Sequence, residues 1–442
     1  MKRRILLSVF VIQLFCFPLW SQQELGLHFI GELPQVQQTN PAMVPGARFF
    51  IALPSAANDF YLSNLTFNEV VDDSGEVLDI DAAIELLDTE NFLREYLTVE
   101  TVTLGLGLGR FQLTLGHATR FNAFLRYPKA LPQLVWQGNA QFLGEEVAFG
   151  PDLQIGGYHE WSAGVAANLI PSLRLGARVK LLSGISDAST ARSGLRLLTN
   201  EETYALTLDS DFLLNTTGSV QYEGYDRTRF ELDFGRESTE QLFSQNRGWA
   251  FDLGLSLQLG RWQLAASALD LGGSINWEED VRNYSLQGIT EYRGLDAAQD
   301  VLNGSTDFGS SLDTLKQVYE LTETRNSYGT ELSNRYYLSV QYHTDDRWQF
   351  GTLFFTERFR GETFPSAALS VRRTIHRGLS LGAVYAYRYE QFNNLGINAV
   401  LGVGPLQLFA ITDNLITTFR PLDSHTANFR VGLNLVVPEK RE

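Results

Sequence analysis

The chain has 442 residues, a formal net charge of −16 and hydrophobic residues at 44% of its positions. Because a nucleic-acid-binding surface needs clustered cations, this acidic balance excludes nucleic acid as an expected partner. The length admits two or three soluble domains or one large barrel. A content of 38 glycines and 12% aromatic residues favours the barrel, which uses them in turns and interfacial girdles.

The first 21 residues have the pattern of a Sec-type export signal. Basic residues Lys2–Arg4 precede an apolar stretch from Ile5 to Phe17, and Ser21 suits the last position before cleavage. This stretch is too short for a membrane anchor, which needs about 20 apolar residues. Cleavage near Ser21 removes Cys16, the one cysteine, and with three basic residues gone the net charge becomes −19. The mature chain then has no disulfide and no cysteine-bound metal.

A short module recurs along the rest of the chain. Residues 104–115 read LGLGLGRFQLTL and residues 253–264 read LGLSLQLGRWQL. Alternation with period two predicts a strand with one apolar face, and two such runs around a glycine-containing pair predict a tight hairpin. Six tight turns of this kind are expected, at Gly109-Arg110, Pro171-Ser172, Gly260-Arg261, Asp345-Asp346-Arg347, His376-Arg377-Gly378 and Val403-Gly404-Pro405.

The facing of individual strands follows from the same alternation. In 251–260 leucines and a phenylalanine alternate with polar or small residues, among them Asp252. In 173–181 the polar face carries Arg174, Arg178 and Lys180. In a membrane barrel the apolar face meets lipid and the polar face meets the lumen, so these four residues are lumen-facing candidates. They are expected to pair with one another or to contact an anionic head group. A soluble β-sandwich shows the same alternation of apolar and polar residues, so this alternation alone does not separate the two folds.

The connections favour the membrane barrel. Tight turns alternate with longer segments, which is the outer-membrane pattern with short turns in the periplasm. One strand near Arg48–Pro54, twelve in the hairpins and one at Asn428–Val437 make an antiparallel barrel of about 14 strands, with a range of 12–16. The upper limit reflects segment 182–249, in which Leu195–Leu198 and Tyr204–Leu208 are either extended loop strands or an extra membrane pair.

Two loop segments have helical spacing. Asp81–Tyr96 carries apolar residues on roughly one side, and Leu312–Leu321 does so behind Ser310-Ser311 as an N-cap. Each is expected to be a short surface helix on the barrel mouth, with a ligand gate as the alternative.

Residues 22–47 precede the first strand and are a candidate plug. Asn40, Pro41 and Ala42 form a turn signal, because asparagine before proline initiates turns and proline fixes φ near −65°. Apolar residues upstream need burial, and the lumen is the nearest place for it: Leu25, Leu27, Phe29 and Ile30. A plain linker is the alternative.

An Asn-Pro-Ala motif ahead of a 14-strand barrel resembles FadL-like transporters of hydrophobic compounds, whose N-terminal segment plugs the lumen. A longer series of motifs is similar to an outer-membrane barrel family of Bacteroidota, domain-of-unknown-function family 5723. It comprises Asn40-Pro41-Ala42, Leu53-Pro54, Gly138-Asn139, Gly176, Lys180-Leu181, Gly184, Asp252-Leu253-Gly254, Asp270-Leu271-Gly272, Ile275, Trp277 and Thr412-Asp413-Asn414. This second resemblance implies an outer-membrane barrel without an established activity or catalytic residues.

Signals for catalysis are weak. His159-Glu160 begins a metalloprotease motif but lacks the second histidine, and Asp72–Glu76 lacks the ligand spacing of a calcium loop. No enzyme activity, cofactor or metal site is expected.

The expected organisation is a signal peptide (1–21), a plug (22–47) and an outer-membrane barrel with long extracellular loops (48–442). Two functions remain open. One is a channel for small hydrophobic compounds, with such a ligand or a detergent molecule in the lumen. The other is a non-transporting scaffold for envelope or secretion partners. The expected environment in both cases is outer-membrane lipid.

Overall fold

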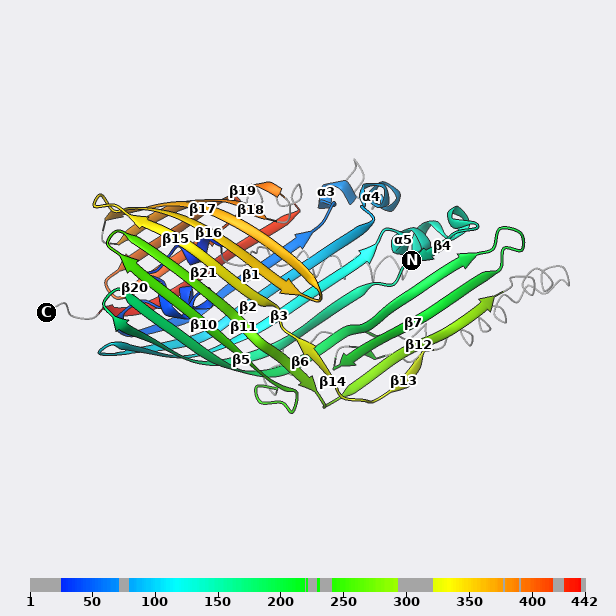
Figure 1. Ribbon diagram of the computed structural model, residues 1–442, viewed down its shortest axis with the longest axis horizontal. Helices are drawn as coiled ribbons and strands as arrows, with labels where there is room; N and C mark the ends of the chain where they lie inside the picture. Colours follow the sequence, from blue (N-terminus) through cyan, green and yellow to red (C-terminus); the bar gives the residue numbers. More distant parts are fainter. Residues whose placement is uncertain are drawn as a thin grey trace.

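The computed structural model describes residues 25–70, 79–218, 220–221, 229–230, 241–292, 321–376, 378–388, 391–415 and 425–438. Fourteen strands form a closed barrel, which occupies the left half of Figure 1. They are β1 (Ala47–Leu62), β2 (Glu90–Leu108), β3 (Phe111–Pro128), β5 (Asp152–Ile170), β6 (Leu173–Thr199), β10 (Arg247–Leu259), β11 (Trp262–Trp277), β15 (Asn334–His343), β16 (Trp348–Phe359), β17 (Glu362–His376), β18 (Leu379–Arg388), β19 (Gln391–Val403), β20 (Leu406–Thr412) and β21 (Thr426–Pro438).

The barrel closes where its first strand pairs with its last. β1 and β21 are antiparallel from Ala47↔Pro438 to Tyr61↔Thr426, and each other pair of neighbours in the ring is antiparallel as well. The predicted all-β fold of about 14 strands is therefore confirmed. All six predicted hairpins join neighbouring strands at the edge where β1 begins and β21 ends, which we call the turn edge. The opposite end is the mouth.

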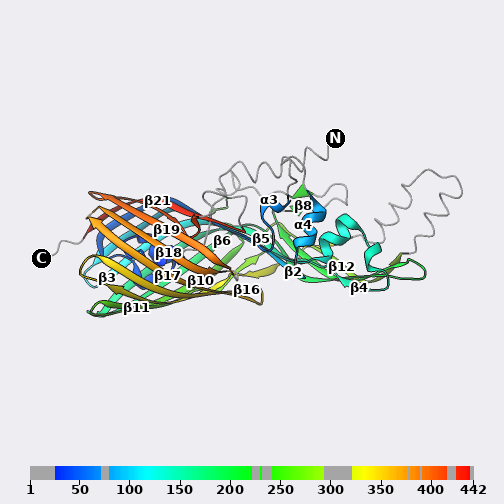
Figure 2. The same ribbon diagram turned by 90° about the horizontal axis from the view of Figure 1, so that it is seen from above.

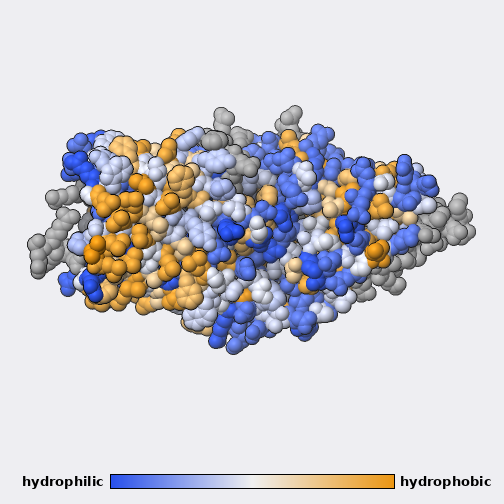
Figure 3. All heavy atoms as spheres, viewed as in Figure 1, coloured by the Kyte–Doolittle hydropathy of each residue, from blue (hydrophilic) through white to orange (hydrophobic). Residues whose placement is uncertain are grey.

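The alternation of residue types produces two different surfaces. In β10 Leu253 and Leu255 are 53% and 37% exposed on the outside, whereas Asp252, the residue before Leu253, is 0% exposed. The same alternation in neighbouring strands surrounds the barrel with exposed leucine, valine and aromatic side chains. Figure 3 shows this apolar surface over the barrel half, whereas the other half is mainly hydrophilic.

A sheet extends beyond the barrel wall on the mouth side. β6 runs for 27 residues, far more than the roughly 9–11 that a membrane strand needs, and its second half pairs with β7 (Leu206–Thr217). β7 pairs with β12 (Val281–Tyr292), which pairs with β13 (Thr322–Thr324). Figures 1 and 2 show this extension projecting away from the barrel. Leu195–Leu198 and Tyr204–Leu208 therefore belong to extended loop structure, and the alternative of 16 barrel strands is wrong.

The short remaining strands belong to the mouth. β14 (Tyr328–Glu331) pairs with the end of β11, and β4 (Glu146–Ala148) pairs with β6. β8 (Val220–Gln221) and β9 (Arg229–Phe230) form a separate pair.

The helices are short. They are α2 (Leu25–His28), η1 (Pro34–Gln38), η2 (Pro41–Met43), α3 (Phe67–Val70), α4 (Ile80–Leu86), α5 (Ala130–Pro132), η3 (Gln133–Gln137) and η4 (Ala140–Phe142). Among the described residues no helix has the length and apolar character needed to cross a membrane.

The helix expected over Asp81–Tyr96 is half wrong. α4 ends at Leu86, and from Glu90 onward the chain is strand β2, because those residues pair with β1 and β3. Pairing with these two neighbouring strands overrides the local helical spacing of this segment. The helix expected over Leu312–Leu321 lies, apart from Leu321, outside the described residues.

Candidate functional site: the plugged lumen

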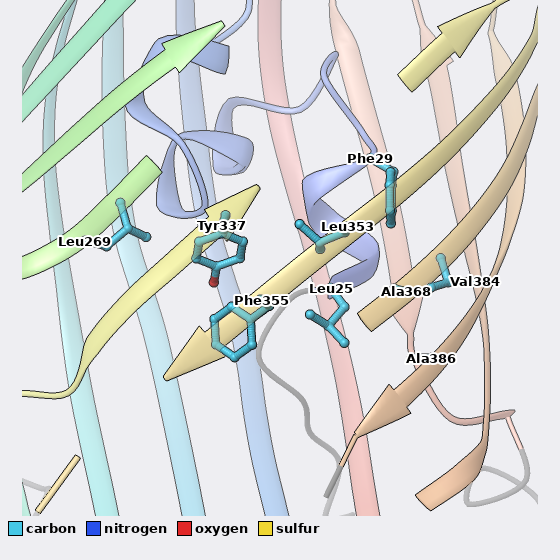
Figure 4. Close-up of a cluster of buried hydrophobic side chains, with 9 residues drawn as sticks. All are labelled: Leu25, Phe29, Leu269, Tyr337, Leu353, Phe355, Ala368, Val384 and Ala386. Carbon is cyan, nitrogen blue, oxygen red and sulfur yellow. The ribbon is translucent and has the colours of Figure 1, made fainter. Parts of the chain in front are cut away.

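The segment before β1 lies inside the barrel. We call its described part, residues 25–46, the plug; it comprises α2, η1 and η2. Six of its apolar side chains are 0% exposed: Leu25, Leu27, Phe29, Ile30, Leu33 and Val36. Figure 4 shows Leu25 and Phe29 beside side chains from β15, β16, β17 and β18. The described part of the candidate plug therefore fills the lumen near the turn edge.

Asn40 connects the plug to the barrel wall. It precedes η2 in an extended conformation, and its side-chain oxygen accepts the Ala42 N–H at 2.8 Å. Its Nδ2 donates to the carbonyl oxygens of Leu255 on β10 and Ala266 on β11, both at 3.1 Å. Pro41 follows at the first helical position, where its missing N–H costs nothing. The Asn-Pro-Ala motif is thus a cap and a wall contact at once.

Two wall glycines make this contact possible. A Cβ on Gly176 of β6 would lie 2.3 Å from the carbonyl carbon of Pro41. A Cβ on Gly254 of β10 would lie 2.1 Å from the Asn40 side-chain oxygen. Any larger residue at either position would push the plug away from the wall. The glycines noted in the sequence therefore have a packing role at the plug.

His28 is the buried polar centre of the plug. Its Nε2 lies 2.8 Å from Ser339 Oγ on β15, and its Nδ1 lies 3.0 Å from Thr39 Oγ1. The Thr39 hydroxyl already donates to the Val36 carbonyl, so Nδ1 carries the proton and Nε2 accepts from Ser339. The ring also stacks on Tyr337, with centroids 5.4 Å apart. Burial lowers the pKa of His28 from 6.5 to about 3, so the ring is neutral at pH 7.

The wall residues Arg178, Lys180 and Asp252 lie together in the lumen. Arg178 is 2.6 Å from Asp252, and Lys180 lies between Asp252 at 3.0 Å and Asp270 at 2.5 Å. Arg335 also pairs with Asp270. All these side chains are almost completely buried. We call them, with Arg120 and Glu160, which form a further ion pair at 2.7 Å, the charge cluster.

Arg174 has a different role from its two neighbours on β6. Its guanidinium donates to the Val44 carbonyl at 2.5 Å, at the point where the plug leads into β1. Each of the four lumen-facing candidates therefore contacts either a wall carboxylate, a wall cation or the plug backbone. The alternative of contact with an anionic head group gains no support from this arrangement, because Arg178 and Lys180 are paired with carboxylates and Arg174 donates to the plug backbone.

A second closure lies on the mouth side of the plug. Arg94 on β2 is 2.6 Å from Glu357 on β16, a strand of the opposite wall, and both are 1% exposed. The Arg94 guanidinium is also surrounded by four aromatic rings at 4.6–5.4 Å, those of Tyr96, Phe124, Phe359 and Phe364. We call this arrangement the upper closure. Contact between opposite walls leaves little open lumen at this level.

The tip of the β16–β17 hairpin is also attached to the far wall. Arg360 at the tip has a left-handed φ of 49° and is followed by Gly361 at 82°. Its guanidinium donates to Asp152 on β5, with the Nε contact at 2.9 Å, and to the Thr190 carbonyl on β6. Arg126 on β3 joins the same group through Asp152 at 3.2 Å and Glu362 at 2.6 Å. These ion pairs hold the hairpin across the mouth.

The cavities match this closed state. A cavity of about 40 Å³ borders the charge cluster at Arg120, Asp270 and Arg335, which is space for about three water molecules. A wider hollow of about 480 Å³ lies at the mouth beside Arg360 and Asp152. In the described ranges, no group of three or more histidine, cysteine, aspartate or glutamate residues is arranged to hold a metal ion.

One family model covers most of the chain, including the end of the plug and nearly all of the barrel. The family of unknown function DUF5723 matches residues 41–413. The chain belongs to this family. The comparison with curated proteins gave no match.

Several solved protein structures resemble the chain at low sequence identity. A Pseudomonas aeruginosa FadL homologue has a TM-score of 0.43 and 11% identity, over 92% of this chain and 94% of that one. The Pseudomonas putida toluene transporter TodX has a TM-score of 0.42 and 10% identity, over 91% and 92% of the two chains. The Ralstonia pickettii toluene transporter TbuX has a TM-score of 0.33 and 9% identity, over 92% and 94%.

Several residues of the site escaped the sequence reasoning. Arg94, Glu357, Asp152 and Arg360 belong to strands or turns far apart in the chain. A charged residue on the inward face of β2, such as Arg94, was the available signal, because an unpaired buried charge needs a partner. The identity of that partner depends on contact across the lumen, which strand periodicity does not encode.

Proposed function

We propose that the protein is an outer-membrane channel in a closed state, gated by its N-terminal plug, and that it passes small hydrophobic compounds. The observation that carries this proposal is an apolar patch on the inner wall that the plug covers. The proposal has three supports: the outer surface, the inner patch and the two closures.

The outer surface of the barrel suits a membrane. Exposed leucines follow one another at alternate positions of adjacent strands, for example Leu104 and Leu106 on β2 and Leu113 and Leu115 on β3. In water such a continuous apolar surface is unfavourable, whereas in a membrane it meets hydrocarbon. The hydrophilic sheet extension then lies outside the cell, and the turn edge faces the periplasm.

The inner wall has an unusual apolar patch. The lumen of a membrane barrel is ordinarily polar, yet five apolar side chains point inward from the four adjacent strands β15 to β18 and are at most 4% exposed: Tyr337, Leu353, Phe355, Ala368 and Val384. Leu25 and Phe29 of the plug cover them, as Figure 4 shows. Movement of the plug would uncover a wall that favours apolar solutes over polar ones.

Passage requires movement of both closures. The plug occupies the lumen near the turn edge, and the Arg94–Glu357 pair joins the walls above it. An apolar compound entering from the mouth meets the upper closure first and the covered patch second. Apart from its continuity with β1, the plug is held to the wall by hydrogen bonds, packing and the Arg372–Glu32 ion pair, so its displacement needs no bond cleavage.

Tags test the membrane orientation. A short epitope inserted in the exposed turn at Glu201-Glu202, between β6 and β7, should be accessible to antibody on intact cells. The same epitope at Gly260-Arg261 should become accessible only after the outer membrane is permeabilised. The reverse pattern would refute the orientation, and fractionation away from the outer membrane would refute the location.

Uptake tests the proposed selectivity. Liposomes that contain a variant lacking residues 24–44 should take up an apolar aromatic hydrocarbon faster, relative to a sugar of similar size, than liposomes with the intact chain. Adding Leu353→Asn and Phe355→Asn should reduce that preference several-fold. Ser370→Asn, at an inward polar position of β17, is the matched control and should leave it unchanged. A preference that all these variants share would contradict an apolar path.

A second candidate is a closed barrel that anchors the projecting sheet for an envelope partner. The observation that favours it is the interlocked set of buried ion pairs at the upper closure and in the charge cluster. A folded barrel that stays closed when the plug is removed and the Arg94–Glu357 pair is also broken would favour this scaffold.

A further inference from the structure

The outer wall has a hollow in its apolar surface on the side opposite the patch described above. Two cross-strand rows form its sides. One runs through Leu104, Leu115, Ala163 and Val179, and the other through Val102, His117, Trp161, Leu181 and Trp249. Ala163 is the one small side chain in the first row. The hollow has a volume of about 380 Å³ and is lined almost wholly by carbon atoms.

The second row contains a polar group that apolar surroundings do not explain. His117 is 9% exposed and borders the hollow, and its Nδ1 is 3.0 Å from Thr101 Oγ1. Its Nε2 is buried and has no hydrogen-bond partner among the described residues. Leaving a buried nitrogen unpaired is unfavourable, so this atom calls for a partner that arrives with a ligand.

Aromatic side chains border the same end of the hollow. Trp161 packs against the His117 ring at 4.3 Å between centroids and stacks on Phe243 at 5.2 Å. The Trp161 indole N–H donates to the Leu242 carbonyl. Trp249 and Phe243 are 56% and 63% exposed on this surface. Tryptophan at such a position is typical of the boundary between hydrocarbon and head groups.

We propose that this hollow binds one acyl chain of a membrane lipid and that the polar linkage above the chain forms a hydrogen bond with His117 Nε2. The hydrocarbon of the chain fills the space over Ala163, and the linkage reaches the interfacial end beside Trp161. The inference rests on the membrane location proposed above and is independent of any transport. The barrel would then hold one lipid molecule at a specific site, in addition to the bulk lipids that surround it.

Native mass spectrometry tests this site directly. The full chain, purified in detergent and washed free of lipid, is incubated with 1-palmitoyl-2-oleoyl-phosphatidylethanolamine at a low molar ratio. The wild type should retain one lipid molecule through activation of the micelle. Ala163→Leu, which fills the hollow, should reduce the retained fraction at least five-fold. Ala383→Leu, a small outward position on β18 beside the exposed Ile397, is the matched control and should retain lipid like the wild type.

Substitutions of His117 distinguish a specific hydrogen bond to the lipid from simple filling of the hollow by an acyl chain. His117→Phe should weaken retention while leaving the hollow apolar, and His117→Gln, which keeps a polar atom, should weaken it less. Heat-modifiable migration in gels checks that each variant is a folded barrel. Equal retention by Ala163→Leu and wild type would overturn the site, as would capture of a free fatty acid in place of the lipid from native membranes. A barrel that passes the tag test yet retains no lipid would refute this inference and leave the membrane location intact.

Discussion

At the scale of single residues, Asn40 has three separate roles. It caps η2, donates to two wall carbonyls and lies against Gly254. Because its amide is fully buried, each of its hydrogen bonds replaces water that cannot enter. The plug therefore depends on this side chain both for its local turn and for its attachment to the wall.

Asn40→Ala should loosen the plug. The change removes the cap and leaves the Ala42 N–H without its partner, which costs about 1–3 kcal/mol of plug attachment. Hydrogen exchange of plug amides should then be faster by at least five-fold, while exchange in the barrel strands stays slow. Gln37→Ala is the control, because its side chain donates to Pro34 within the plug itself. Equal protection of the plug in Asn40→Ala and Gln37→Ala would contradict the attachment role.

His28 should make plug attachment sensitive to acid. Its pKa is about 3 in the plugged state and about 6.5 when exposed, so the neutral ring favours attachment above pH 6.5. As the pH falls below 6.5 toward 3 the released state binds the extra proton, and at pH 5 attachment is weaker by about 2 kcal/mol. Protection of plug amides, calculated relative to the intrinsic exchange rate at each pH, should fall in the wild type from pH 7.5 to pH 5. His28→Gln, which does not titrate, should show a flat protection profile, and a parallel loss of protection in both proteins would argue against His28.

Residue facing was predictable from the sequence, whereas residue pairing was not. Alternation along β6 and β10 indicated that Arg178, Lys180 and Asp252 share the inner surface, and the structure brings these three together. Alternation carries no information about Asp270 or Arg335 as further partners, because they come from strands whose register depends on the closed ring. Arg174 shares the same face but lies closer to the turn edge, where its guanidinium donates to a carbonyl oxygen of the plug backbone.

At the scale of elements, the tight hairpins could be predicted because each is local. A glycine with positive φ, such as Gly260 at 60° or Gly404 at 62°, reverses the chain between two alternating runs. The 27-residue length of β6 was not predictable, since its second half is stabilised by β7 and β12 rather than by its own pattern. The strand at Glu90–Tyr96 was missed for the same reason, because its partners lie on β1 and β3.

The upper closure should depend on both members of its ion pair. Arg94→Met leaves Glu357 as a buried charge without its guanidinium, which costs about 3–5 kcal/mol. Hydrogen exchange near the tip of the β16–β17 hairpin should therefore rise strongly in the single variant. The double variant Arg94→Met, Glu357→Leu replaces the pair with apolar groups and should recover most of the protection. If hydrogen exchange in the double variant is as fast as in Arg94→Met, the upper closure depends on other contacts.

At the scale of the whole molecule, the barrel combines an apolar outer surface with a lumen filled by its own N-terminal segment. The number of strands followed from the alternation of short and long connections along the chain. A plug in the lumen was expected from the apolar residues before the first strand, but its contacts with the wall were not, because they depend on how glycines of the wall and residues of the plug fit together. The central claim is that this filling is a gate.

Single-channel recording in planar bilayers tests that claim most directly. The intact chain at pH 7.5 should show little conductance. Deletion of residues 24–44 should raise it, and the same deletion combined with Arg94→Met should raise it further, because both obstacles to ions are then removed. Gel migration before and after heating checks that each barrel is folded. A folded barrel that stays as closed as the intact chain in both variants would contradict the gate and favour the scaffold.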